Sequence, residues 1–419
     1  MLVLGRSLNT INQMIVKKAR EMGIYTYVVC FKPETCWEKD IADEYWVQDL
    51  YDKDLLIKNC REKGIDGIYG QGDTLGSLAL EISKELGIRY YCDAETWHYG
   101  RNKADFKKKC KEYGVRVARD YFFSEEPTEE EISRIEFPVV VKPIDCSGNV
   151  GISYCYNKED FVNAYIFAKQ KSASGKIVVE KMLQGKEYGA FYACANGELR
   201  LLNFWVMLSQ PGTPANCYAI NSSVTDNLHK YLQNVNSNVK NMLQGIGVRD
   251  GVVWLELMED TDGEIYAIEM GHRLSGEMMW VPLADVTGFD ALEWMIKYTV
   301  NGRNDSARLP VEQTDYYEKC ACGYILWTRK EGVIASVEGV DAIKNSNALK
   351  LFLSAQPGVH VDAFKYGSIV TLTAKNCDEM CEKIKFINDT FNVKDVEGSE
   401  MFINYDNFDF LKELDSMRN

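Results

Sequence analysis

The 419-residue sequence has few histidines, few prolines and no long hydrophobic run. It contains four histidines and nine prolines, and no stretch approaches the 18 apolar residues that suggest a membrane-spanning helix. We therefore expect no membrane span. The apolar run at residues 1–4 is too short for the core of a signal peptide. The thirteen cysteines form no framework typical of a secreted protein, so a cytoplasmic location is expected.

The chain also has fewer basic than acidic residues. The chain has 48 Lys and Arg against 62 Asp and Glu, which gives a formal net charge of −14. A surface of this sign repels a phosphate backbone, so nucleic acid is not an expected partner, although one small basic pocket remains compatible. Zinc is not expected either, because no histidine lies at ligand spacing from the cysteines at 320 and 322 or at 377 and 381.

The common glycine signatures for binding nucleotide phosphates are missing. No G-x-x-x-x-G-K-[ST] P-loop occurs. Gly5 ends the first expected strand, but the residues after it lack the second and third glycines of a dinucleotide fingerprint. No acidic residue ends the next strand, expected at 24–29. The sequence therefore favours a Rossmann-like sheet without a nicotinamide cofactor.

A helix–glycine–strand pattern recurs through the first 120 residues. Four glycines each follow a helical stretch and precede Ile or Val: Gly23, Gly64, Gly87 and Gly114. Glycine just past a helix is the usual left-handed C-cap. The pattern predicts strands at 24–29, 65–69, 88–91 and 115–117, the first three within an open parallel sheet with helices on both faces.

The remainder of the chain alternates between strands and helices. Strands are expected at 137–141, 152–156, 177–180 and 188–195. One helix is expected at 157–171, and a long helix at about 224–245. The tail from about residue 320 predicts short strands with one helix near 378–388. The fold class is therefore α/β.

Two glutamates are expected to face each other across a hairpin. The dipeptide at 262–263, Asp-Gly, is a strong signal for a two-residue turn. If Thr261 lies opposite Glu264, the register pairs Glu256 with Glu269, with β-carbons about 5 Å apart. Facing like charges destabilise a sheet, whereas a divalent cation would resolve the conflict, and paired carboxylates with phosphate oxygens suit magnesium. The alternative is a solvent-exposed pair.

Two more residues share the face of these glutamates. Gly271 and Arg273 follow Glu269 at a spacing of two, the period of a strand. Gly271 has no side chain, so we expect open space on this face beside Glu269. Arg273 offers a planar fork of donors that matches a phosphate or a carboxylate.

A lysine and a glycine-containing loop suggest a site for phosphate. The strand at 137–141 leads into Lys142, and a buried lysine needs an anion because an uncompensated charge is costly. In the loop that follows, Gly148 and Gly151 allow backbone N–H groups to approach phosphate oxygens, beside Ser147. The alternative is an ordinary hairpin turn whose lysine reaches solvent.

Residues 178–188 form a strand, a short connector and another strand. The backbone of the connector can hydrogen-bond an adenine edge, and Glu187 can accept hydrogen bonds from ribose hydroxyls. A solvated glutamate at the edge of a strand is the alternative for Glu187.

Taken in order, these segments resemble the motifs of the ATP-grasp superfamily of carboxylate–amine ligases, in its biotin carboxylase-like and L-amino-acid-ligase-like subgroup. Residues 102–115, which begin Asn-Lys and end Gly-Val, look like the family's "dK…Gv" segment. Residues 269–273 are similar to its "E-x-N-x-R" motif, except that Gly271 replaces the asparagine that helps to hold a second magnesium. The resemblance covers nearly the whole chain.

The resemblance implies three parts and a set of site residues. The parts are a Rossmann-like pre-ATP-grasp domain (1–98), a two-subdomain ATP-grasp fold (99–308, with a lid at about 115–183) and a small β-rich, α+β C-terminal domain (309–419). The nucleotide contacts would be Lys103, Lys142, Ser147, Gly148, Glu180, Lys181, Leu183 and, at the ribose, Glu187. Glu256 and Glu269 would hold Mg²⁺, with Mn²⁺ as an alternative ion, and Arg273 would hold the acyl phosphate or the substrate carboxylate.

The activity implied by the resemblance is ATP-dependent joining of a carboxylate to an amine through an acyl phosphate, as in a dipeptide-type amino-acid ligase. The alternatives are an enzyme similar to phosphoribosylglycinamide synthetase or carbamoyl phosphate synthase, and a non-catalytic ATP-binding regulatory protein, which Gly271 favours. The expected partners are small carboxylate and amine substrates, with a homodimer as the candidate assembly. The sequence does not specify the substrates.

Overall fold

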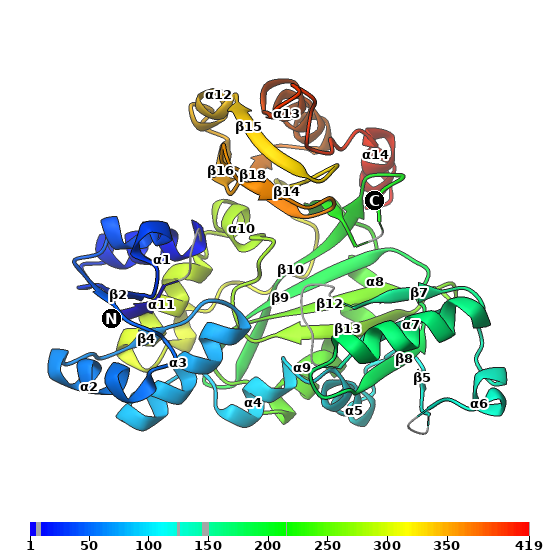
Figure 1. The fold of residues 1–419 in the computed structure, drawn as a ribbon, viewed down its shortest axis with the longest axis horizontal. Helices are drawn as coiled ribbons and strands as arrows, with labels where there is room; N and C mark the ends of the chain where they lie inside the picture. Colours follow the sequence, from blue (N-terminus) through cyan, green and yellow to red (C-terminus); the bar gives the residue numbers. More distant parts are fainter. Residues whose placement is uncertain (6–9, 124–125, 145–150, 215, 419) are drawn as a thin grey trace.

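The computed structural model describes residues 1–5, 10–123, 126–144, 151–214 and 216–418. Its first part is a parallel four-stranded sheet in the order β3-β2-β1-β4 (Figure 1, blue). The strands are β1 (Leu2–Leu4), β2 (Tyr27–Cys30), β3 (Glu44–Val47) and β4 (Ile68–Tyr69). The helices are α1 (Thr10–Glu21), α2 (Lys53–Lys63) and α3 (Gly72–Leu86). The predicted parallel sheet is therefore present.

A small antiparallel sheet lies in the segment predicted to be a lid, on the right in Figure 1. Its order is β5-β8-β6-β7. The strands are β5 (Asp120–Tyr121), β6 (Val139–Pro143), β7 (Ser153–Cys155) and β8 (Ile177–Lys181). The helices are α6 (Glu129–Ser133) and α7 (Lys158–Lys171), and Phe161, Ala164 and Ala168 of α7 pack on Val139 and Val141 of β6. This predicted lid segment therefore has a hydrophobic core of its own.

The largest element is an antiparallel eight-stranded sheet in the order β13-β12-β9-β10-β11-β14-β18-β16. Its strands are β9 (Glu187–Ala195), β10 (Glu198–Ser209), β11 (Tyr218–Ser222), β12 (Gly251–Glu259), β13 (Ile265–Gly271), β14 (Cys320–Trp327), β16 (Leu349–Leu353) and β18 (Tyr366–Ala374). The last three belong to the predicted C-terminal domain, yet they continue the sheet formed by the five earlier strands. The domain division at 308/309 stays a prediction. Strands from both sides of this boundary belong to the same sheet.

Helices cover both faces of this central sheet, which explains why all nine residues of β9 are buried. Tyr188 and Tyr192 pack on one face with helices α5 (Lys103–Glu112), α8 (Leu228–Asn234) and α9 (Asn236–Gly245). Phe191 and Ala193 pack on the other face with α10 (Trp280–Thr287) and α11 (Ala291–Asn301). Alternate residues of one strand therefore belong to two separate hydrophobic clusters.

The remaining elements are a three-stranded sheet and short helices at the C-terminal end and between the main units. The sheet has the order β17-β15-β19. Its strands are β15 (Gly332–Glu338), β17 (His360–Val361) and β19 (Asn392–Asp395). The helices are α4 (Ala94–Tyr99), α12 (Val340–Lys344), α13 (Cys377–Thr390) and α14 (Phe408–Ser416), with short 3₁₀ helices at Pro33–Thr35, Trp37–Asp40 and Ser306–Arg308. Within the described ranges, no helix is both long and apolar enough to cross a bilayer.

Three expected elements differ from the structure. Residues 88–91 form no strand, because Tyr91 packs its ring against Trp97 and His272 while the chain turns into α4. The strand expected at 115–117 is a single bridge between Val117 and Ala267. The helix expected at 224–245 is two helices, which meet at residue 235.

Candidate active site

The glutamates Glu256 and Glu269 lie opposite each other on β12 and β13, as the sequence predicts. The route to this pairing differs from the prediction. Near the turn Glu259 pairs with Ile265, one residue out of the register that a two-residue turn gives. A β-bulge beside Glu256 and Leu257 then shifts the register by one residue and restores the predicted pair.

A third carboxylate shares this face of the sheet. Gly189 of β9 pairs with Glu256, so Glu187, two residues earlier, points to the same side. The Tyr218 hydroxyl donates to Oε2 of Glu187, whereas Oε1 is buried without a donor. The sequence interpretation assigned Glu187 to a ribose; the structure places it beside the expected metal ligands.

These three carboxylates have different proton affinities. Burial and the neighbouring charge of Glu187 raise the pKa of Glu256 well above its ordinary value. Burial also raises the pKa of Glu187. For Glu269 burial acts in the same direction, but the charge of Lys103 outweighs it and holds the pKa below its ordinary value. Only Glu269, of the three, therefore has a basic partner in direct contact.

Lys103, predicted to contact phosphate, lies at the first residue of α5 with its Nζ 2.8 Å from Oε2 of Glu269. Asn102 caps this helix by accepting from the backbone N–H of Asp105. Burial lowers the pKa of Lys103, but Glu269 and Glu256 raise it above its ordinary value. A cationic amine thus lies directly beside the carboxylate pair, where a bound phosphate would need it.

Lys142 is buried at the end of β6 and forms an ion pair with Glu180 of β8. Glu180 also forms an ion pair with Lys107, whose Nζ is 2.5 Å from Asp120. Burial raises the pKa of Glu180, but Lys142 and Lys107 lower it to about 2. The sequence analysis missed Lys107. Ser147 and Gly148, predicted to cover phosphates, lie outside the described residues.

The connector after β8 is attached to the end of the β12–β13 hairpin. Nζ of Lys181 lies 2.5 Å from Asp260, and Asp260 also accepts from the backbone N–H of Gln184. Leu183, which immediately precedes Gln184, is buried. The proposed adenine connector is therefore held by an acidic residue of the hairpin that also carries Glu256.

Arg273 is engaged by an acidic residue 200 positions earlier. Its Nε and one terminal nitrogen donate to the two carboxylate oxygens of Asp73 at 2.7 and 3.2 Å. The other terminal nitrogen donates to the carbonyl oxygen of Leu274, which also accepts from Gln71. The guanidinium lies over the Trp254 ring, 5.1 Å from its centroid. The parallel sheet and the hairpin therefore meet at Arg273, and no pattern in the sequence pointed to Asp73.

Gly271 sits against the same tryptophan. A β-carbon at residue 271 would lie 2.3 Å from two atoms of the Trp254 indole. We therefore expect Gly271→Asn to lower the free energy of unfolding by about 1–3 kcal/mol, because the ring must move. Urea denaturation measures this. Gly276→Asn is the matched control, because a β-carbon there meets open space. Equal stability of the two variants would contradict the steric account.

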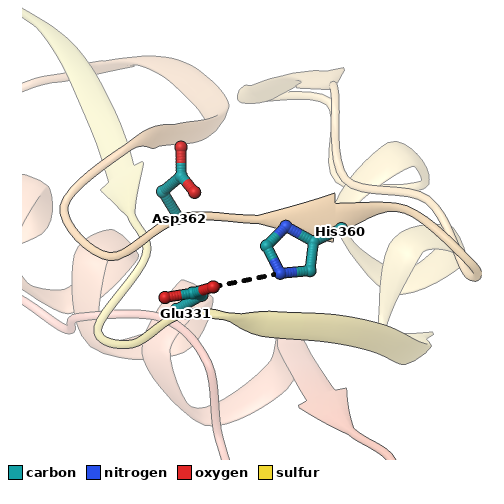
Figure 2. Close-up of side chains that lie close together, drawn as sticks. All are labelled: Glu331, His360 and Asp362. Atoms are coloured by element: carbon teal, nitrogen blue, oxygen red, sulfur yellow. Dashed lines mark ion pairs between the residues drawn. The ribbon is translucent and has the colours of Figure 1, made fainter.

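A second group of side chains of the kinds that bind metal ions lies in the C-terminal part, away from Glu256 and Glu269. Glu331, His360 and Asp362 place one ligand atom each within 4.8 Å of one another, and His360 forms an ion pair with Glu331 (Figure 2). All three residues are exposed. Their arrangement matches a surface ion-pair group, and we assign no function to it.

The residues of the carboxylate site fit a divalent cation. Carboxylates that face each other across two strands, together with the Glu187 oxygen that has no donor, are a donor set suited to Mg²⁺ or Mn²⁺ with phosphate oxygens. Lys103 beside the pair supplies positive charge for the same phosphates. The arrangement is therefore suited to binding a metal–nucleotide complex.

Comparisons with known proteins agree with this geometry. Residues 135–280 match the family model of the ATP-grasp domain. The fold matches an L-amino acid ligase from Bacillus licheniformis (15% identity, TM-score 0.75, 94% of this chain and 98% of that one). It also matches biotin carboxylase from Campylobacter jejuni (18% identity, TM-score 0.75, 100% and 95%).

In sequence, the chain is 25% identical over 290 residues to the carbamoyl phosphate synthase large chain of Clostridium beijerinckii. The aligned region covers 65% of this chain and 26% of that one. The chain thus spans about a quarter of the length of that relative. The predicted resemblance is confirmed: this protein contains an ATP-grasp domain and has an ATP-grasp fold.

Proposed function

We propose that the protein is an ATP-dependent ligase that activates a carboxylate as an acyl phosphate and joins it to an amine. The observation that carries this proposal is the pair Glu256 and Glu269, opposite each other in a hairpin that lies within the matched ATP-grasp region, with Lys103 in contact. Two carboxylates and a lysine at one point supply what a metal–triphosphate needs.

Each residue of the site has a distinct part in this reaction. Glu256 and Glu269 would hold the divalent cation, which when bound neutralises charge on the phosphate oxygens. Lys103 and Lys142 would contact the phosphates, and Lys142 would exchange Glu180 for a phosphate oxygen. Arg273 keeps donor positions beyond those used by Asp73 and would hold the substrate carboxylate or the acyl phosphate.

The lid and the connector complete the site. Lys181 and Leu183, with the backbone near Glu180, would hold adenine, and the ion pair from Lys181 to Asp260 fixes that segment on the hairpin. The loop that contains Ser147 and Gly148 would cover the phosphates and keep water from an acyl phosphate, which otherwise hydrolyses. Chemistry of this kind depends mainly on positioning and charge neutralisation.

We infer an amino acid as the carboxylate substrate, in a dipeptide-type reaction. The support is the structural match to an L-amino acid ligase over nearly the whole of both chains. A second candidate is an activity similar to that of carbamoyl phosphate synthase, supported by the sequence match to its large chain. A phosphoribosylglycinamide synthetase-like ligase and a non-catalytic ATP-binding protein are a third and a fourth candidate. A cytoplasmic location and a homodimer stay predictions.

A substrate screen separates these candidates. The protein is incubated with Mg-ATP and pairs of amino acids, with bicarbonate and ammonia, or with glycine and phosphoribosylamine. ADP release is measured and products are identified by mass spectrometry. ADP formation that requires two amino acids, with a dipeptide as product, supports the proposal. Carbamoyl phosphate or a glycinamide product identifies the second or the third candidate, and nucleotide binding without turnover identifies a regulatory protein.

Replacing Lys142 by Ala is expected to weaken ATP binding by at least about tenfold, because a charge-assisted contact to phosphate is lost. Isothermal titration calorimetry with a non-hydrolysable ATP analogue measures this. Lys158→Ala is the matched control, since Lys158 is exposed at the start of α7 and pairs with Glu129. An unchanged affinity in the Lys142 variant would remove Lys142 from the site.

A further inference from the structure

A row of charged side chains leads from helix α5 to Lys142. Glu180 of β8 lies directly opposite Asp120 of β5, and Lys107 of α5 contacts both carboxylates. At one end of the row Lys111 pairs with Asp120. At the other end Lys142 pairs with Glu180. The charges therefore alternate along the row, and the three lysines exceed the two carboxylates by one positive charge.

Lys107 is fixed in this row, whereas Lys142 is held at one point. The Lys107 side chain is buried, and its Nζ contacts Glu180, Oδ1 of Asp120 at 2.5 Å and the carbonyl oxygen of Ala118 at 3.3 Å. An ammonium group has three donors, so all of them are used. Among the described residues, Nζ of Lys142 contacts only Oε1 of Glu180. Lys142 is therefore the lysine that can leave the row at the loss of one contact.

The departure of Lys142 would leave a buried carboxylate that still needs a cation. Glu180 is only 5% exposed, and an uncompensated charge at such a position is costly. Lys107 already contacts the second oxygen of Glu180, Oε2. Once Lys142 leaves, two lysines and two carboxylates remain, so the charges of the row balance.

Helix α5 places Lys107 from outside the sheet that contains Glu180. Lys107 follows Lys103 by four residues, so both side chains lie on the same face of the helix. Lys103 contacts Glu269 of the β12–β13 hairpin, whereas Lys107 contacts strands β5 and β8. The position of Lys107 is therefore independent of β6, the strand that carries Lys142.

We propose that Lys107 is a positioning residue for nucleotide binding: it compensates the charge of Glu180, which frees Lys142 to bind a phosphate oxygen. This inference rests on the proposed function, in which Lys142 exchanges Glu180 for the nucleotide. Lys107 itself does not contact the nucleotide, because its three donors stay on Glu180, Asp120 and Ala118.

A double-mutant cycle in the full chain tests this role. Isothermal titration calorimetry with a non-hydrolysable ATP analogue compares the wild type, Lys107→Met, Glu180→Gln and the double variant. Lys107→Met is expected to bind the analogue at least about tenfold more weakly, because Lys142 is then needed at Glu180. In the double variant no charge at residue 180 needs compensation. Its affinity is therefore expected to lie within about threefold of that of Glu180→Gln.

Lys109→Met is the matched control, because Lys109 lies on the same helix and pairs with Glu112 near its surface. It should bind the analogue as the wild type does. Near-ultraviolet circular dichroism checks that each variant is folded. If Lys107→Met does not fold, Lys107→Gln replaces it in the cycle, with the same expected results.

Two results would overturn the inference. One is an unchanged affinity in the Lys107 variant while Lys142→Ala weakens binding. The other is an equal loss from the Lys107 substitution with and without Glu180→Gln, which would make Lys107 a purely structural residue. If the wild type does not bind the analogue at all, the proposed function itself fails.

Discussion

Glu269→Gln is expected to lower ATP turnover by at least about a hundredfold while the protein stays folded. Lys103 holds the pKa of Glu269 below its ordinary value despite burial, which favours the ionised carboxylate. The amide keeps the size of the side chain but removes the negative charge that a divalent cation needs. Steady-state ADP release with saturating Mg-ATP measures the loss.

The stability of the same variant gives an independent check. The substitution removes one of two facing carboxylates, and Lys103 remains close enough to Glu256 to compensate its charge. The melting temperature without ligand is expected to stay the same or to fall slightly, because relief of the facing charges is offset by loss of the ion pair between Lys103 and Glu269. Glu264→Gln is the control, because Glu264 follows the hairpin turn and pairs with Arg116. Turnover within about threefold of the wild type in Glu269→Gln would remove Glu269 from the metal site.

Arg273→Lys is expected to lower turnover by at least about a hundredfold with little change in nucleotide affinity. A lysine keeps the charge, but it cannot donate to both oxygens of Asp73 and lie flat on Trp254 while reaching a substrate. Turnover is measured together with calorimetric binding of an ATP analogue. Arg116→Lys, on the exposed pair with Glu264, is the matched control.

Asp73→Asn separates positioning from direct contact with substrate. It leaves the guanidinium in place and removes its charged partner, so turnover should fall less than in Arg273→Lys. If both variants lose the same activity and the same stability, the pair is a structural bridge and Arg273 has no separate part in the reaction. Normal turnover in Arg273→Lys would also rule out the assigned role.

The hairpin of β12 and β13 was predicted correctly in part from the sequence. Strand periodicity and the turn at 262–263 were enough to pair Glu256 with Glu269, and the pair is confirmed. The reasoning was wrong near the turn, where Glu259 pairs with Ile265 and a bulge restores the register. A bulge depends on packing against neighbouring strands, so local sequence does not reveal it.

Contacts between distant segments were beyond the reach of the sequence. Asp73 and Arg273 are 200 positions apart, and Lys107 reaches Glu180 across 73. Neither acidic residue lies at a spacing that signals its partner, because the tertiary arrangement of the sheets alone brings them together. The same reason explains the strand expected at 88–91, where Gly87 caps α3 as predicted but Tyr91 turns inward to pack on His272.

The contacts of Gln71 and Asp73 with Leu274 and Arg273 limit which N-terminal segments of related proteins could replace residues 1–98. Gln71 and Asp73 both reach the segment that follows β13, one by way of a backbone carbonyl and the other by way of the guanidinium. A chimera that exchanges the first 98 residues would retain this junction only if the incoming segment carried an amide and a carboxylate at those two positions. Without them, only Leu274 and Trp254 would hold the arginine of the grafted protein.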